Sequence, residues 1–171
     1  MRNTIRLIAL LAALAGAVTY GWRWLFPDDE AQIHALLERI ADGVGGSGGE
    51  GDVTRLQRAA SVGDEFDADV TVDAGAPFEK LRGRDAIIGT AARVNVAVRN
   101  LDVSFTDVTI QVDPAGGRAT ANLTAEARFD EAGSGRGVDA RELAVAFTRS
   151  NGSWVVSAVT LVPTLRRIDQ P

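Results

Sequence analysis

Apolar residues recur with two periods along this chain, one typical of helices and one typical of strands. The first helical pattern follows a run of acidic residues at positions 28–30 and ends where glycines crowd residues 43–51. Acids in a first turn suit the positive end of the helix dipole, and glycines favour a helix end. Spacings of three and four place the apolar side chains on one helix face. These residues are Ile33, Leu36, Leu37 and Ile40.

Two more helices are expected further along. The second begins with Asp52 as its N-cap and directs Val53, Leu56 and Ala60 inward. The third begins at residues 83–85, after a turn at residues 74–77 and a short partner strand at residues 78–81. Its apolar positions are Ile87, Ile88, Ala91, Val94 and Val98.

Strand-type alternation begins at Phe66 and returns after Asn100 as four strands joined by turns. Apolar residues are odd-numbered up to Phe105 but even-numbered from Val108, so we expect a β-bulge near residues 106–107. Residues 119–129 alternate cleanly, with small apolar side chains on one face. A similar change of phase between Val138 and Leu143 predicts a second bulge. Helices that precede a long meander of strands indicate an α+β fold.

The first 27 residues form a separate segment. Residues 7–18 contain no charged side chain, and the apolar stretch continues to Phe26, which is about the ~20 residues that a membrane-spanning helix needs. Arg2 and Arg6 precede it, so the positive-inside rule places the N-terminus in the cytoplasm and the following domain outside the inner membrane. Trp22 and Trp24 then fall at the outer interface.

A cleaved signal peptide is the alternative for this segment, because residues 15–17 fit a small-x-small cleavage site. The aromatic residues after the span favour an uncleaved single-pass anchor. We therefore divide the chain into an anchor at residues 1–27, a domain at residues 28–163 and a tail at residues 164–171.

The charge of the domain limits its partners. Three of the 18 basic residues and none of the 23 acidic residues precede Pro27, which leaves 15 bases against 23 acids in the domain and tail together, a net charge of about minus eight. Nucleic acid is not an expected partner, because its phosphates attract clustered basic residues. The chain has no cysteine, which excludes disulfides, thiolate metal sites and cysteine nucleophiles.

The order of helix, helix, strand pair, helix and four-stranded meander resembles the NTF2-like superfamily over roughly residues 28–163. The most specific local piece is Phe-Glu-Lys-Leu-Arg-Gly-Arg-Asp-Ala-Ile at residues 78–87, which is similar to the family's entry into its third helix. The resemblance implies an NTF2-like cone, with three helices packed in a strongly curved, mostly antiparallel sheet. It also implies a pocket at the open end, used by some members for catalysis and by others for binding or assembly.

Candidate pocket residues follow from that resemblance. His34 is the chain's only histidine and could carry a proton at the mouth of the cone, although a surface or boundary histidine is the simpler interpretation. Arg93 could hold an anion, or lie in solvent. Isomerase-type relatives need a tyrosine beside their catalytic acid, and the only tyrosine here is Tyr20, inside the apolar segment. The apolar candidates for the pocket are Phe105, Ala125 and Phe147.

Two other motifs carry less weight. Acidic residues between Asp64 and Asp73 could suggest calcium, but their spacing does not match an EF-hand loop, so no metal site is expected. Residues 43–48 match G-x-G-x-x-G but follow a helix rather than a strand, so a connector is expected and no cofactor is assigned.

The sequence therefore predicts a membrane-tethered, extracytoplasmic binding or assembly module that recognises a small apolar ligand or a partner protein. The alternative is a SnoaL-like lyase, isomerase or hydrolase that uses His34 or a pocket aspartate. A structural homodimer, paired through the threonine-rich outer face of the sheet, is a third interpretation.

Overall fold

The computed structural model describes residues 28–46, 51–76, 79–97, 99–131 and 135–162. Three helices and six strands lie within these residues, in the order expected from the sequence. The predicted anchor at residues 1–27 and the tail at residues 164–171 lie outside them. Within the described residues, no helix is long and apolar enough to cross a membrane. The elements are α2 (Asp29–Val44), α3 (Asp52–Asp64), β1 (Phe66–Asp73), β2 (Leu81–Arg82), α4 (Arg84–Ala97), β3 (Arg99–Val112), β4 (Arg118–Glu131), β5 (Gly135–Ser150) and β6 (Ser153–Leu161).

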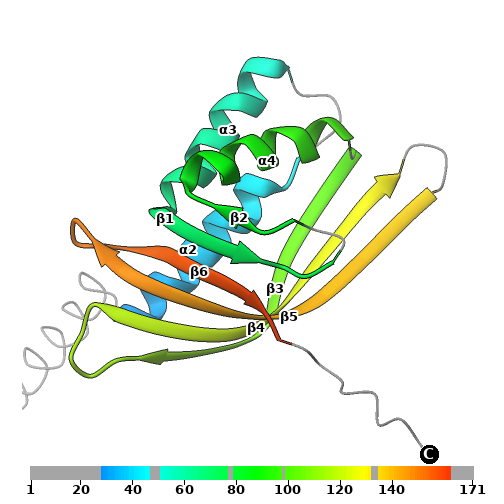
Figure 1. Cartoon of the computed structure of the whole chain (residues 1–171). Helices are drawn as coiled ribbons and strands as arrows, with labels where there is room; N and C mark the ends of the chain where they lie inside the picture. The colour runs from blue at the N-terminus through cyan, green and yellow to red at the C-terminus, as the bar shows by residue number, and fades with distance from the viewer. Residues whose placement is uncertain (1–27, 47–50, 77–78, 98, 132–134, 163–171) are drawn as a thin grey trace, which may run out of the picture.

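All six strands form one curved sheet in the order β2-β1-β6-β5-β4-β3. Neighbouring strands are antiparallel except β1 and β6, which run parallel. The three helices lie on one side of this sheet (Figure 1). This arrangement confirms the α+β class and fits the NTF2-like cone.

The first helix has the predicted register. Asp28 is its N-cap, and the Asp28 carboxylate accepts a hydrogen bond from the backbone N–H of Ala31 at 2.8 Å. The predicted apolar stripe is buried in the core against strand residues that include Phe147 and Val156. The stripe consists of Ile33, Leu36, Leu37 and Ile40.

The inward face predicted for the second helix is wrong. Val53 is 69% exposed, Leu56 is 59% exposed, and Ala60 is also exposed. The helix instead buries Ala59, Val62 and Gly63, and its N-cap is Gly51 rather than Asp52. Two apolar stripes compete on this short helix, and the buried one contains the glycine that lets α4 approach closely.

The contact between α3 and α4 makes a testable prediction. A Cβ at Gly63 would lie 2.5 Å from Cγ1 of Ile88, whereas a Cβ at Gly89 of α4 would meet nothing within 4 Å. We expect Gly63→Ala to lower the free energy of unfolding by about 1–3 kcal/mol, because Ile88 must move. The matched change Gly89→Ala should raise it by about 0.5–1 kcal/mol, because alanine favours a helix. Urea titrations of both variants measure these changes, and equal effects would contradict the close contact.

The bulge predicted in β3 is confirmed. The pairing of β3 with β4 shifts between Thr106 and Thr109, and Asp107 has a positive φ of 53°. Because the bulge adds a residue, Phe105 and Val108 both pack against the core despite their opposite parity.

The second bulge, predicted near Val138, is wrong. Strands β4 and β5 pair without a register shift from Arg118 opposite Thr148 to Glu131 opposite Gly135. Val138 is therefore 64% exposed on the outer face. The inner face of β5 carries Asp139 and Arg141 in this half of the strand, so polar residues replace the expected apolar ones.

Arg141 explains why a charged side chain is tolerated on the inner face. Its guanidinium donates to the carbonyl oxygens of Ala74 at 2.6 Å and Ala76 at 3.1 Å, and its Nε pairs with Asp139 at 3.0 Å. This ties β5 to the loop that follows β1. Lys80 contacts Asp73 at the base of the same loop at 2.7 Å, and this hydrogen bond lowers the pKa of Asp73.

The segment that carried the family resemblance has a clear structural role. Gly83 has a positive φ of 83° and donates its backbone N–H to the carbonyl of Val70 at 2.8 Å. Arg84 then starts α4, and its guanidinium donates to the carbonyl of Phe66. This turn therefore fastens the start of α4 to the first residue and to the middle of β1.

Candidate functional site

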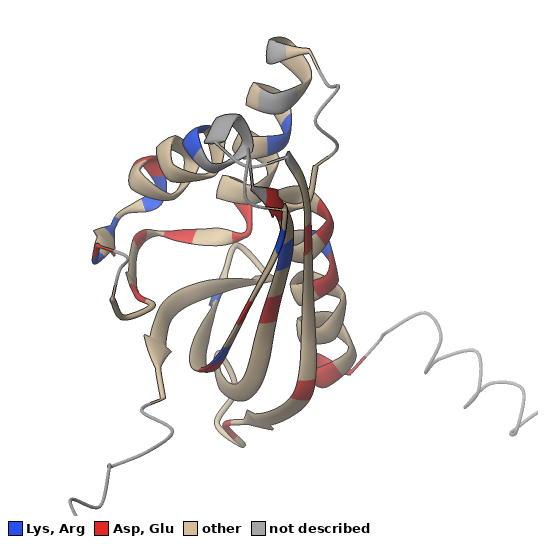
Figure 2. Ribbon diagram, turned by 90° about the vertical axis from the view of Figure 1, so that its right-hand side faces the viewer, with Lys and Arg blue, Asp and Glu red and all other residues tan. Residues whose placement is uncertain are grey.

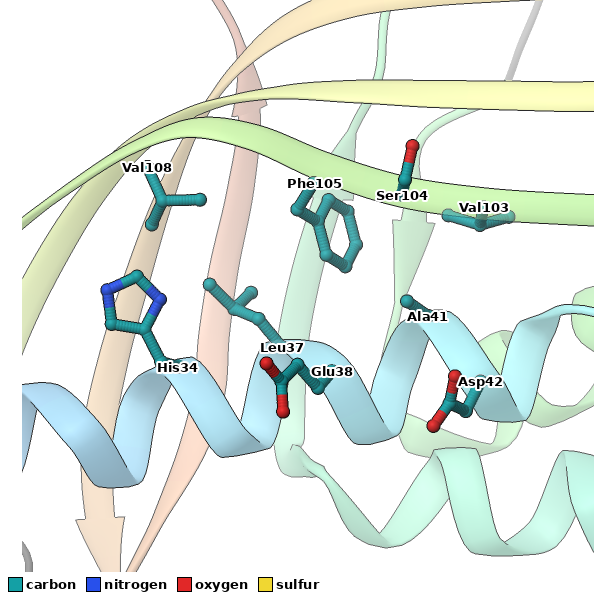
Figure 3. Close-up of a pocket in the computed structure, with 9 residues that line it drawn as sticks. All are labelled: His34, Leu37, Glu38, Ala41, Asp42, Val103, Ser104, Phe105 and Val108. Atoms are coloured by element: carbon teal, nitrogen blue, oxygen red, sulfur yellow. The ribbon is translucent and has the colours of Figure 1, made fainter.

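A groove of about 340 Å³ runs between α2 and the edge strand β3. Its volume is at the lower end of the range for small-molecule sites. Figure 3 shows α2 along one side of the groove and β3 along the other. The lining residues are His34, Leu37, Glu38, Ala41, Asp42, Val103, Ser104, Phe105 and Val108.

The helix contributes a polar line to the groove. His34, Glu38 and Asp42 are spaced four residues apart, so they lie on one face of α2, and all three are exposed. No lysine or arginine is among the residues that line the groove. Figure 2 shows further acidic positions along α2 beside the strands. The groove therefore favours a ligand with positive charge.

The strand contributes an apolar wall. Phe105 and Val108 point toward α2 in Figure 3, and Leu37 projects toward them from the helix. The β3 bulge brings these two side chains to the same face, because an unbroken strand would turn one of them outward. Ser104 points to the opposite side of β3 from His34. The groove therefore joins an apolar wall to an acidic rim, without a serine aimed at the histidine.

The structure brings together only some of the residues suggested by the sequence. His34 and Phe105 line the groove, and Ala125 is paired directly opposite Phe105 on β4 and is half-buried. Arg93 is exposed on α4, and its guanidinium donates to the hydroxyl of Thr90 at 3.1 Å. Phe147 is only 2% exposed and belongs to the hydrophobic core.

Sequence reasoning missed Glu38 and Asp42. Their spacing from His34 by one and two helical turns was a signal that could have found them. It also missed the inward pair of Asp139 and Arg141, for which the carbonyl partners lie in a loop about 65 residues earlier in the chain. Over the residues that the structure describes, no group of three or more histidine, aspartate or glutamate side chains is arranged to hold a metal ion.

Comparison with known proteins identifies the fold. No family model and no curated protein matches the sequence. Among solved structures, a protein named as a scytalone dehydratase from Novosphingobium aromaticivorans is 14% identical, with a TM-score of 0.65, and the match covers 80% of this chain and 85% of that one. A protein named as an aromatic ring hydroxylase from the same organism is 16% identical, with a TM-score of 0.65 and coverage of 81% and 90%.

A third similar structure is named as an association domain. It is named as a calcium/calmodulin-dependent protein kinase II association domain from Xanthomonas campestris, is 11% identical, and has a TM-score of 0.56 over 80% of this chain and 86% of that one. At such identities the likeness shows the fold alone. The chain has the fold of NTF2-like proteins, and its structural neighbours are of the scytalone dehydratase-like and SnoaL-like kind.

Proposed function

We propose that this protein is a non-enzymatic binding module, which holds a small ligand or a segment of a partner protein in the groove between α2 and β3. The observation that carries the proposal is the composition of the groove: an apolar wall with Phe105 and Val108 faces an acidic helix rim. Such a lining suits recognition of an apolar body with a positive group. Acyl transfer would require a nucleophile within reach of a base, and Ser104 points away from His34.

Bound material tests this proposal directly. Ala41 lies on the helix side of the groove, so Ala41→Trp should fill it, whereas Ala60→Trp on the exposed face of α3 is a matched control. We expect native mass spectrometry of the full-length protein to detect a retained molecule in the wild type and in Ala60→Trp. The molecule should be absent from Ala41→Trp. Equal retention by all three proteins would place the ligand elsewhere.

A SnoaL-like lyase, isomerase or hydrolase is the second candidate. Two observations favour it: His34 and Glu38 lie one turn apart in the same groove, and two of the similar structures carry enzyme names. In that case His34 would act as the acid or base, and His34→Ala would abolish turnover while leaving ligand retention intact. A binding module shows no turnover to lose.

We further propose that residues 1–27 anchor the module in the inner membrane, with the N-terminus in the cytoplasm and the domain outside. The apolar stretch before Pro27 and the two arginines at positions 2 and 6 support this placement.

A homodimer through the outer face of the sheet is a further proposal. Thr120 and Asn122 of β4 lie exposed on that face. The groove is on the other face of the sheet, so a dimer of this kind would leave it accessible.

The anchor gives a strong predicted effect in a fractionation experiment. The full-length protein should stay in the membrane pellet after washing with alkaline carbonate. The double variant Leu11→Arg and Leu14→Arg should move to the supernatant, because each arginine at the centre of a span costs about 2.5–3.5 kcal/mol. The conservative double variant Leu11→Ile and Leu14→Ile is the control. Release of the wild type by carbonate would contradict the anchor.

A further inference from the structure

The edge of β3 is paired at one end by another part of the chain. Strand β3 is the last in the sheet, so only β4 pairs with it along its length. At Leu101, however, the backbone N–H of Gly46 donates to the Leu101 carbonyl at 2.9 Å and forms an isolated antiparallel bridge. This bridge shows that the open side of β3 accepts a backbone partner.

The direction of this hydrogen bond shows which backbone groups further along β3 face the open side of the strand. The Leu101 carbonyl points away from β4, and backbone groups alternate sides along a strand. The N–H and C=O groups of Val103 and Phe105 therefore also point to the open side. Within the described part of the chain, no backbone hydrogen bond reaches them from that side. Both residues line the groove.

We propose that the groove binds an extended segment of a partner protein, which adds as a short antiparallel strand to β3 opposite Val103 and Phe105. This inference rests on the proposed binding function and names its ligand. The strand site is short, because the Gly46 bridge closes one end and the Asp107 bulge disrupts the other.

The acidic rim specifies which side chains the added strand carries. Residues directly opposite Val103 and Phe105 would place their side chains on the same face of the sheet, toward α2. Figure 3 shows Asp42 opposite Val103 and Glu38 opposite Phe105 across the groove. Ala41 and Leu37 lie nearer to the strand than the two carboxylates. Two basic residues at alternate positions would thus each meet one carboxylate.

The spacings agree with this arrangement. Alternate residues of a strand are about 6.8 Å apart, and helix residues four apart are separated by about 6 Å along the axis. The aliphatic part of an arginine could lie against Leu37 and Ala41 while its guanidinium reaches the carboxylate. The inferred ligand is therefore an extended peptide with basic residues two apart.

A defined peptide tests the inference. The probe is fluorescein-labelled Val-Arg-Val-Arg-Val with blocked ends, and binding is followed by fluorescence anisotropy on the full-length protein in phosphatidylcholine nanodiscs. N-methylation of the two arginine residues removes the N–H groups that face β3, so binding should weaken at least about tenfold. N-methylation of the central valine, whose N–H faces away, should change binding less than about threefold.

Charge variants test the acidic rim separately. Glu38→Gln with Asp42→Asn should weaken peptide binding about tenfold, because both ion pairs are lost. The control pair Glu79→Gln with Asp85→Asn makes the same change of net charge at exposed positions outside the groove, and it should leave binding unchanged.

The outcomes separate this inference from the proposed function. If both methylated peptides bind like the parent, strand addition is overturned, while retention of a small molecule in the groove would keep the binding function. A concentration-dependent second copy that excludes the peptide would also overturn the partner assignment. If no peptide binds and Ala41→Trp retains the same molecule as the wild type, both the inference and the proposed function fail.

Discussion

Replacement of Phe147 by alanine should lower the free energy of unfolding by about 3–5 kcal/mol, one of the two largest effects that we expect. The ring is 2% exposed and packs in the same core cluster as Ile33 and Leu36 of α2. Removing it leaves a cavity between helix and sheet that the rigid strands cannot fill. Urea titration of the full-length protein in mild detergent, followed by circular dichroism, measures the loss.

Phe105→Ala is the matched control for this prediction. Phe105 is half-buried and borders the groove, so its removal should cost less than about 2 kcal/mol, since less of the ring leaves an apolar environment. Ligand retention should be weakened more by Phe105→Ala, which removes part of the groove wall, than by Phe147→Leu, which keeps an apolar side chain in the core. Equal stability losses for the two alanine variants would contradict the division between core and groove.

The second large effect is expected at Trp154. Its ring is 3% exposed, its indole N–H donates to the carboxylate of Asp29 at 3.3 Å, and the guanidinium of Arg149 lies 5.0 Å from the ring centroid. Arg149 also pairs with Asp29. This cluster joins the first turn of α2 to the β5–β6 hairpin. Trp154→Ala should therefore cost about 3–5 kcal/mol in urea titrations.

A conservative change separates packing from hydrogen bonding in this cluster. Trp154→Phe keeps an aromatic ring but removes the indole N–H, so it should cost about 1–2 kcal/mol, with the lost hydrogen bond contributing about 1 kcal/mol. Asp29→Asn should weaken the ion pair with Arg149 by a smaller amount, because both side chains are partly solvated. A loss for Trp154→Phe as large as that for Trp154→Ala would contradict a packing role for the ring.

The sequence pattern predicted the parts of the fold that are set by residues close together in the chain. The spacing from Ile33 to Ile40 set the buried face of α2, because one stripe on that helix is apolar. The change of parity between Phe105 and Val108 revealed the bulge, because a strand side chain cannot change face without an extra residue. These two features position both walls of the groove.

The parts that failed depend on contacts distant in sequence. Helix α3 has two apolar stripes, and the choice between them depends on Ile88, which packs against Gly63. In β5, Arg141 faces inward because the carbonyls of Ala74 and Ala76 receive its hydrogen bonds. Neither partner can be recognised from the local pattern, so apolar residues were assigned to the wrong face in both cases.

The groove illustrates the same division between local and distant information. His34, Glu38 and Asp42 could have been grouped by their helical spacing alone. Their position beside β3 could not have been predicted from this spacing. Helix α2 meets an edge strand that lies about 60 residues later in the chain, and this contact exists only in the assembled sheet.

Hydrogen–deuterium exchange on the full-length protein tests the binding account most directly. The comparison is between the protein with its retained molecule and the Ala41→Trp variant, with Ala60→Trp as the control. We expect occupancy of the groove to slow exchange in residues 34–42 of α2 and residues 101–108 of β3, and to leave the rest of the sheet unchanged. Protection confined to β4 and β5, with the groove segments unaffected, would contradict it.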